Sequence, residues 1–194
     1  MAGRQHRQHG FAVASDPTQA RLEQAIALHQ GGQTAKAIPL YERVLLSKPR
    51  HFDALHMLGV CRLQQGQLDK ALPLLEAALR VNPASADAHN HLGLVRQNAG
   101  EPVEAIQSFQ RALQIDSLHY DSLLNLGVLL LDLNMPQGAL QCLELAAALR
   151  PDSAEALHQQ GNALLACGRT TDALGAFDKA LQLMPDHAQC WFHR

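Results

Sequence analysis

The sequence predicts an all-α protein that folds as a right-handed α-solenoid, a stack of antiparallel helix pairs. Hydrophobic residues make up 47% of the chain and are mostly leucine and alanine, which favour helices, whereas aromatic residues make up only 4%. Small residues also recur with a period of 34 residues, which is typical of one helical unit stacked on copies of itself. The recurring residues are Gly59, Gly93, Gly127 and Gly161, together with Ala37, Ala71, Ala105, Ala139 and Ala173.

The period divides the chain into five complete repeats, whose positions we number from 1 to 34. The repeats cover residues 18–51, 52–85, 86–119, 120–153 and 154–187. Before them, residues 1–17 contain an apolar run of only four residues, 11–14, which is too short for a signal peptide or a membrane span of about 20 residues. We therefore expect a disordered N-terminal tail and a cytoplasmic protein.

Residues 188–194 begin a sixth repeat, with Trp191 at position 4. A repeat array requires a terminal cap with a polar outer face, and this segment provides none. The sequence therefore favours a truncated sixth repeat, with further repeats or a catalytic domain after residue 194. Alternatively, the chain ends here naturally, and this segment covers helix B of the fifth repeat.

Each repeat is predicted to contain helix A at positions 2–14 and helix B at positions 17–30. Helix A should occupy residues 19–31, 53–65, 87–99, 121–133 and 155–167, and helix B residues 34–47, 68–81, 102–115, 136–149 and 170–183. A glycine, or Asn134 in the fourth repeat, marks the turn between them, because a helix C-terminus favours a residue that tolerates positive φ. Pro17, Pro102 and Pro136 suit the first turn of a helix, where a missing N–H costs nothing.

Small and large residues alternate at the contact between the two helices. Glycine at position 8 and alanine at position 20 let helix A approach helix B closely. A large apolar residue stands at position 24, where we expect it to lock each repeat onto the next. These large residues are Tyr41, Leu75, Phe109, Leu143 and Phe177.

These small residues, the large residue at position 24, alanine at position 27 and proline at position 32 together resemble the tetratricopeptide repeat. The resemblance covers residues 18–187. It implies a concave surface lined by the A helices, through positions 2, 5, 6, 9, 12 and 13, that binds a peptide or helical segment of another protein. The sequence is thus interpreted as a protein–protein interaction scaffold or adaptor.

The candidate partner-binding residues lie at four of those positions. Position 2 carries a ladder of carboxylates that suits a partner with spaced basic residues; alternatively, each acid stabilises the first turn of its helix through the helix dipole. The ladder consists of Asp53, Asp87, Asp121 and Glu155. Positions 5, 6 and 9 add groups that can contact an extended peptide, namely His56, Met57, Asn90, His91, Asn125, His158, Gln159 and Asn162.

Other functional classes are disfavoured by the composition. The formal charge is −2 and there are only four lysines, so no basic stripe favours nucleic acid. The four cysteines and 11 histidines show no metal-ligand spacing, and no catalytic constellation is apparent, so we expect no metal, no cofactor and no enzymatic activity in this chain. Charging every histidine would move the formal charge from −2 to +9, one unit each, and weaken binding of a basic partner below about pH 6.

A different class of function stays open as an alternative. Residues 49–59 are similar to bacterial proteins in which such repeats precede a glycosyltransferase or sulfotransferase domain. The repeats of O-linked N-acetylglucosamine transferases also carry an asparagine ladder at position 6, of which this chain has only Asn125. This weaker resemblance implies a substrate-recruiting N-terminal arm of a larger transferase.

Overall fold

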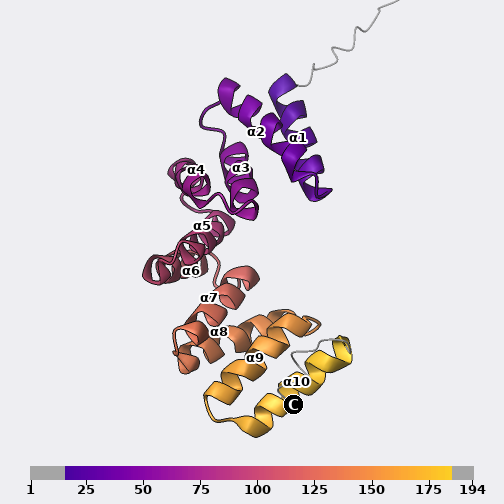
Figure 1. The fold of residues 1–194 in the computed structure, drawn as a ribbon, viewed down its shortest axis with the longest axis vertical. Coiled ribbons are helices and arrows are strands. Elements are labelled where there is room, and N and C mark those ends of the chain that lie inside the picture. Colours follow the sequence, from indigo (N-terminus) through magenta and orange to yellow (C-terminus); the bar gives the residue numbers. More distant parts are fainter. Residues whose placement is uncertain (1–15, 185–194) are drawn as a thin grey trace, which may run out of the picture.

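A computed structural model of the protein describes residues 16–184, and within them the chain forms ten α-helices and no strand. The helices stack in chain order as antiparallel pairs and form a right-handed solenoid (Figure 1). Most of the predicted tail, residues 1–15, and the predicted start of a sixth repeat, residues 188–194, lie outside the described residues. The helices are α1 (Pro17–Gln30), α2 (Thr34–Ser47), α3 (Phe52–Gln64), α4 (Leu68–Val81), α5 (Ala86–Asn98), α6 (Pro102–Ile115), α7 (Tyr120–Asp132), α8 (Pro136–Leu149), α9 (Ala154–Ala166) and α10 (Thr170–Leu183).

The even-numbered helices begin and end at the predicted residues, whereas the odd-numbered helices begin earlier than predicted. In α5 and α9 the reason is a side-chain cap from the serine that precedes the helix, whereas α3 begins after His51 without such a bond. The Oγ of Ser85 accepts a hydrogen bond from the backbone N–H of Ala88, and Ser153 caps α9 in the same way. In α1 the cap is Asp16, followed by Pro17 at the first helical position. Pro17 therefore belongs to the first helix and Asp16 caps it, although both were assigned to the predicted tail, residues 1–17.

The turns inside the repeats have the predicted backbone conformation. Gly66 and Gly100 adopt φ values of 70° and 77°, and Asn134 takes their place in the fourth repeat with φ 58°. Pro39 and Pro73 lie inside α2 and α4, and both helices continue through them.

The position-8 glycines allow helix A to pack on the large side chain of helix B in the same repeat. A Cβ atom at Gly93 would lie 2.5 Å from Cε1 of Phe109, and one at Gly127 would lie 2.5 Å from Cγ of Leu143. The large side chains also reach the following repeat, as predicted. Leu75, for example, shares a buried cluster with Leu92 and Val95 of the third repeat.

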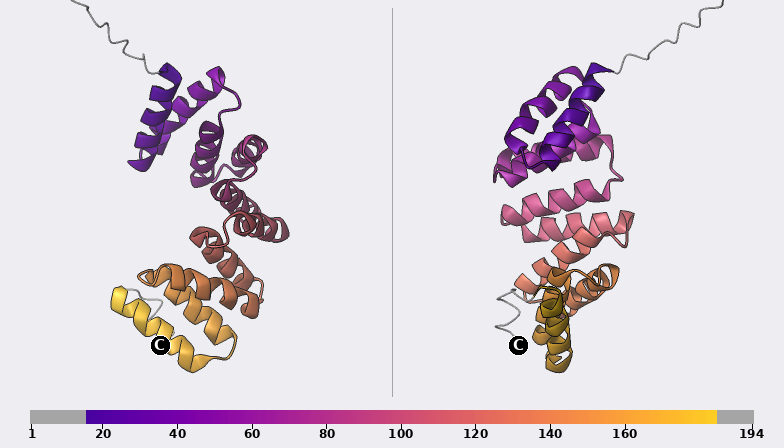
Figure 2. Two further views of the ribbon diagram at one scale, coloured as in Figure 1. Left: turned by 180° about the vertical axis from the view of Figure 1, so that it is seen from behind. Right: turned by 90° about the vertical axis from the view of Figure 1, so that its right-hand side faces the viewer.

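The buried core of the described residues is divided into three clusters along the solenoid. One joins repeats 1 and 2 around Tyr41, and the largest joins repeats 3 to 5. Between them lies a small cluster of four buried side chains, Ala71, Leu75, Leu92 and Val95. Figure 2 shows the same linear arrangement, in which each pair of helices follows the previous one.

The odd-numbered helices form the inner side of the curved stack. Each contacts the next odd-numbered helix directly, while the even-numbered helices make no comparable contact with one another in the described part of the chain. In a curved stack the elements on the inside lie closest together, so the concave face is formed by α1, α3, α5, α7 and α9.

Candidate functional site

The ladder of carboxylates lies exposed at the start of successive concave-face helices. Asp53, Asp87, Asp121 and Glu155 each occupy the first turn of their helix, from α3 to α9, and all four are exposed. The side chains of Asp53 and Asp87 keep 56% and 69% of their surface accessible. Exposed acids in a first turn can interact with the helix dipole and with a partner at the same time, so the two interpretations are compatible.

The other candidates divide into two groups by burial. The position-5 side chains, His56, Asn90 and His158, keep only 4 to 5% of their surface accessible. The position-6 side chains, Met57, His91, Asn125 and Gln159, are half-buried, as is Asn162 at position 9. Only the second group is available to a ligand, and the first group packs behind it.

The buried histidine of α3 is bonded to the next concave-face helix. The Nδ1 atom of His91 lies 2.7 Å from the backbone carbonyl oxygen of Asp87 and 3.0 Å from Nε2 of His56. Because a carbonyl oxygen can only accept, the hydrogen is on Nδ1 of His91, and Nε2 of His56 accepts. The two rings pack edge to face, with centroids 5.0 Å apart.

One repeat further along, an asparagine pair repeats this connection. The Oδ1 atom of Asn90 accepts hydrogen bonds from Nδ2 of Asn125, at 3.0 Å, and from Oγ of Ser122, at 3.2 Å. The position-5 residue of one repeat is thus bonded to the position-6 residue of the next in both cases, across 35 residues of sequence.

Two residues of this network were missed by the sequence reasoning, His119 and Ser122. The Nε2 atom of His119 lies 3.1 Å from Oδ1 of Asp87, and its Nδ1 accepts from the backbone N–H of Ser122 at 3.2 Å. His119 therefore caps α7 and binds the ladder carboxylate of the preceding repeat. The sequence did contain a signal for His119, namely its position 34 in the repeat, because Ser85 and Ser153 cap their helices from the same position.

Burial controls the charge of the histidines on the concave face. Burial, reinforced by the neighbouring His91, lowers the pKa of His56 to about 4. Burial also lowers the pKa of His91, although the carbonyl and carboxylate of Asp87 oppose the shift. His56 therefore stays neutral at pH 6, and the formal charge at that pH stays below the +9 that charging every histidine would give.

The arginines at position 11 connect helices rather than facing the groove. Nη2 of Arg62 lies 2.7 Å from Oε1 of Glu42 on α2, and Nη1 of Arg96 donates to Oγ of Ser108 on α6 at 3.0 Å. Among residues 16–184, no group of three or more His, Cys, Asp or Glu side chains is placed to hold a metal ion. In the same range, no helix is both long and apolar enough to span a membrane.

The comparisons with known proteins agree with this architecture. Family models described as tetratricopeptide repeat match residues 22–75 and 62–120, residues 98–162, and residues 154–187. No curated protein sequence matches the chain.

Solved structures with a similar fold include MamA, at 24% sequence identity and a TM-score of 0.72, covering 89% of this chain and 94% of MamA. YrrB, described as a tetratricopeptide repeat protein with an unusual peptide-binding site, has 20% identity and a TM-score of 0.71, over 92% of this chain and 98% of YrrB. PilF of Pseudomonas aeruginosa has 21% identity and a TM-score of 0.82, over 91% of this chain and 80% of the PilF chain. Together the family models cover most of the sequence, and the chain belongs to the tetratricopeptide repeat family.

Proposed function

We propose that this chain is an interaction scaffold whose concave face binds an extended or helical segment of a partner protein. The observation that carries the proposal is the row of exposed carboxylates, one on each of four successive concave-face helices. A peptide-binding site in YrrB, which has the same fold, supports this use of the architecture. The proposal assigns the chain no chemistry of its own.

The side chains behind the ladder favour binding because they are already ordered. His56 and Asn90 are bonded to the next repeat, and these bonds hold His91 and Asn125 in place at the surface of the groove. A ligand that contacts His91 or Asn125 therefore loses less free energy to side-chain ordering than it would on a mobile surface.

The charges of the groove favour a partner segment with basic residues. Asp121 and Glu155 make no ion pair with another described residue, whereas Asp87 is bonded to His119. Lysine or arginine side chains of a partner would therefore find carboxylates without an ion pair on α7 and α9.

The test compares carboxylates on the concave face with carboxylates in the same local setting elsewhere. An array of basic and acidic peptides would be probed with the wild-type chain, with Asp53→Asn/Asp121→Asn and with Asp69→Asn/Glu104→Gln. Asp69 and Glu104 are also exposed acids in the first turn of a helix, but they lie on α4 and α6. We expect the first pair of substitutions to weaken binding of basic peptides and the second pair to leave it unchanged. Equal effects of the two pairs would contradict the groove assignment.

The alternative role, as the recruiting arm of a transferase, would use the same concave face. The intact mass of the protein from its natural source distinguishes an adaptor of 21.1 kDa from the arm of a larger protein.

A further inference from the structure

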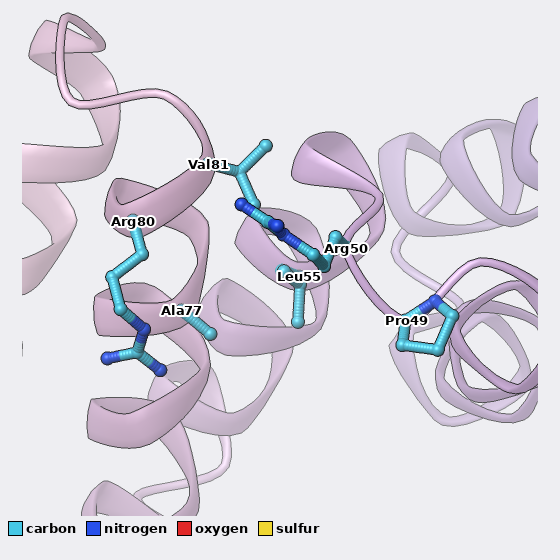
Figure 3. Close-up of a pocket in the computed structure, with 6 residues that line it drawn as sticks. All are labelled: Pro49, Arg50, Leu55, Ala77, Arg80 and Val81. Carbon is cyan, nitrogen blue, oxygen red and sulfur yellow. The ribbon is translucent and has the colours of Figure 1, made fainter.

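A recess lies at the junction between the first and second repeats, and none of its residues belongs to the ladder of carboxylates. It has a volume of about 300 Å³. Figure 3 shows its walls: Pro49 and Arg50 come from the loop between α2 and α3, Leu55 comes from α3, and α4 contributes the rest. The six lining residues are Pro49, Arg50, Leu55, Ala77, Arg80 and Val81.

The only charges lining this recess are two guanidinium groups. Arg50 and Arg80 are both exposed, and neither makes a hydrogen bond or ion pair with a described side chain. Nearby Lys48, in contrast, is paired with Asp16 at 2.6 Å. No carboxylate lines the recess, although the chain as a whole carries a net charge of −2. Two arginines that keep their charge at any physiological pH thus face solvent without a counter-ion.

The other repeats show that the fold does not need this arginine pair. Arg50 stands at position 33 and Arg80 at position 29 of the following repeat. At the three later junctions these two positions hold no arginine and no lysine. The pairs there are, in chain order, Ala84 and Gln114, Leu118 and Ala148, and Asp152 and Gln182. Because the same helix pair is built at each junction, the two arginines are specific to this recess.

We infer that the recess binds an acidic segment of a partner protein in which an apolar side chain lies between carboxylates. The apolar side chain would contact Leu55, Ala77 and Val81, which form the uncharged part of the wall. In Figure 3, Arg50 crosses from the loop toward α4, while the guanidinium of Arg80 lies beside Ala77, so the two cations suit two separate carboxylates. Arginine pairs with carboxylates through two parallel hydrogen bonds, which gives such a site both affinity and orientation.

This site has the opposite charge preference to the concave face. The ladder favours a basic segment, and the recess favours an acidic one. The chain would therefore hold two chemically different partners at once, each at its own surface.

The test is a titration with a fluorescein-labelled heptapeptide that has a central leucine and three glutamates on each side. Two control peptides replace the glutamates by glutamines or the leucine by glycine. The variant Arg50→Gln/Arg80→Gln is compared with Arg43→Gln/Lys70→Gln, which removes the same charge from exposed positions of α2 and α4 outside the recess. Circular dichroism of each variant confirms that the helices are retained.

We expect the glutamate peptide to bind the wild-type chain and Arg43→Gln/Lys70→Gln with similar affinity. The loss of two charge-assisted contacts in Arg50→Gln/Arg80→Gln should weaken binding at least about tenfold, and each control peptide should also bind more weakly. The groove variant Asp53→Asn/Asp121→Asn should bind the acidic peptide as the wild type does, which separates this site from the proposed function of the concave face. Equal weakening by both double substitutions, or no binding at about 1 mM peptide, would overturn the assignment.

Discussion

The glycine at position 8 allows a direct test of the packing, because the chain contains the same residue in a helix with and without a neighbour. Gly93 lies inside α5 and is buried, and a Cβ there would meet Cε1 of Phe109 at 2.5 Å and Cδ1 at 2.7 Å. Gly175 lies inside α10 and is exposed, and a Cβ there would meet nothing within 4 Å. Replacing each glycine by alanine makes the same chemical change in two different environments.

Gly175→Ala should stabilise the chain, whereas Gly93→Ala should leave its stability unchanged or lower it. Alanine is more favourable than glycine inside a helix by about 0.8–1 kcal/mol, so Gly175→Ala should be stabilising by up to that amount. The same gain applies to Gly93→Ala, but the added Cβ would lie 2.5 Å from the fully buried Phe109 ring, so the ring or the helix has to shift. Overpacking of this kind costs about 1–3 kcal/mol. The propensity gain cancels in the comparison, so the free energy of unfolding of Gly93→Ala should be lower than that of Gly175→Ala by about 1–3 kcal/mol.

The assay is urea unfolding followed by circular dichroism, with a thermal melt of the same samples. For a chain of this length a difference of 1 kcal/mol corresponds to about 2–4 °C in Tm. If both alanine variants melt at the same temperature, the contact between glycine and Phe109 does not limit the approach of α5 and α6, and the packing reasoning is refuted.

Three further outcomes are expected. Lowering the pH from 7 toward 4 should destabilise the fold, because the pKa of His56 is about 4 in the folded chain and 6.5 in the unfolded chain. Between these two values the unfolded state binds more protons than the folded state, so its free energy falls relative to that of the fold. The Tm measured between pH 7 and pH 4 should therefore decrease as the pH is lowered, and it should decrease less in His56→Gln. Asn90→Ala should lower the free energy of unfolding in urea by about 1–3 kcal/mol, because Asn90 is buried and accepts two hydrogen bonds from α7. An unchanged unfolding midpoint would show that these bonds do not stabilise the stack. Tyr41→Phe should leave Tm unchanged or raise it, since the Tyr41 hydroxyl is buried without a hydrogen-bond partner among the described residues; a clear drop in Tm would reveal a partner for that hydroxyl.

The helices could be predicted from sequence because their ends depend on local signals. Gly66 and Gly100 end the first helix of their repeats, and Pro102 and Pro136 begin the second, so the bounds of the even-numbered helices were predicted correctly. The helices α5, α7 and α9 start earlier than predicted because their cap lies at position 34, at the end of the preceding repeat. Ser85 and Ser153 occupy this position and are good capping residues, a signal that was present in the sequence.

The candidate site could be predicted only in part, because one repeat does not show how it meets the next. The exposure of Asp53 and Asp121 follows from their place in a first turn. The burial of His56 and Asn90 depends on the tilt between neighbouring repeats, which no pattern within a single helix reveals. Their partners His91 and Asn125 are 35 residues away, one more than the period, so the bonds connect different positions of adjacent repeats.

The division of the core into three clusters has a consequence for how the chain loses its structure. In a solenoid each repeat is stabilised only by its neighbours, so cooperativity passes along the chain through the contacts between them. The middle cluster has four buried side chains and lies between two larger ones. Amide hydrogens of α4 and α5 should then exchange through partial openings that leave α7 to α9, in the largest cluster, protected.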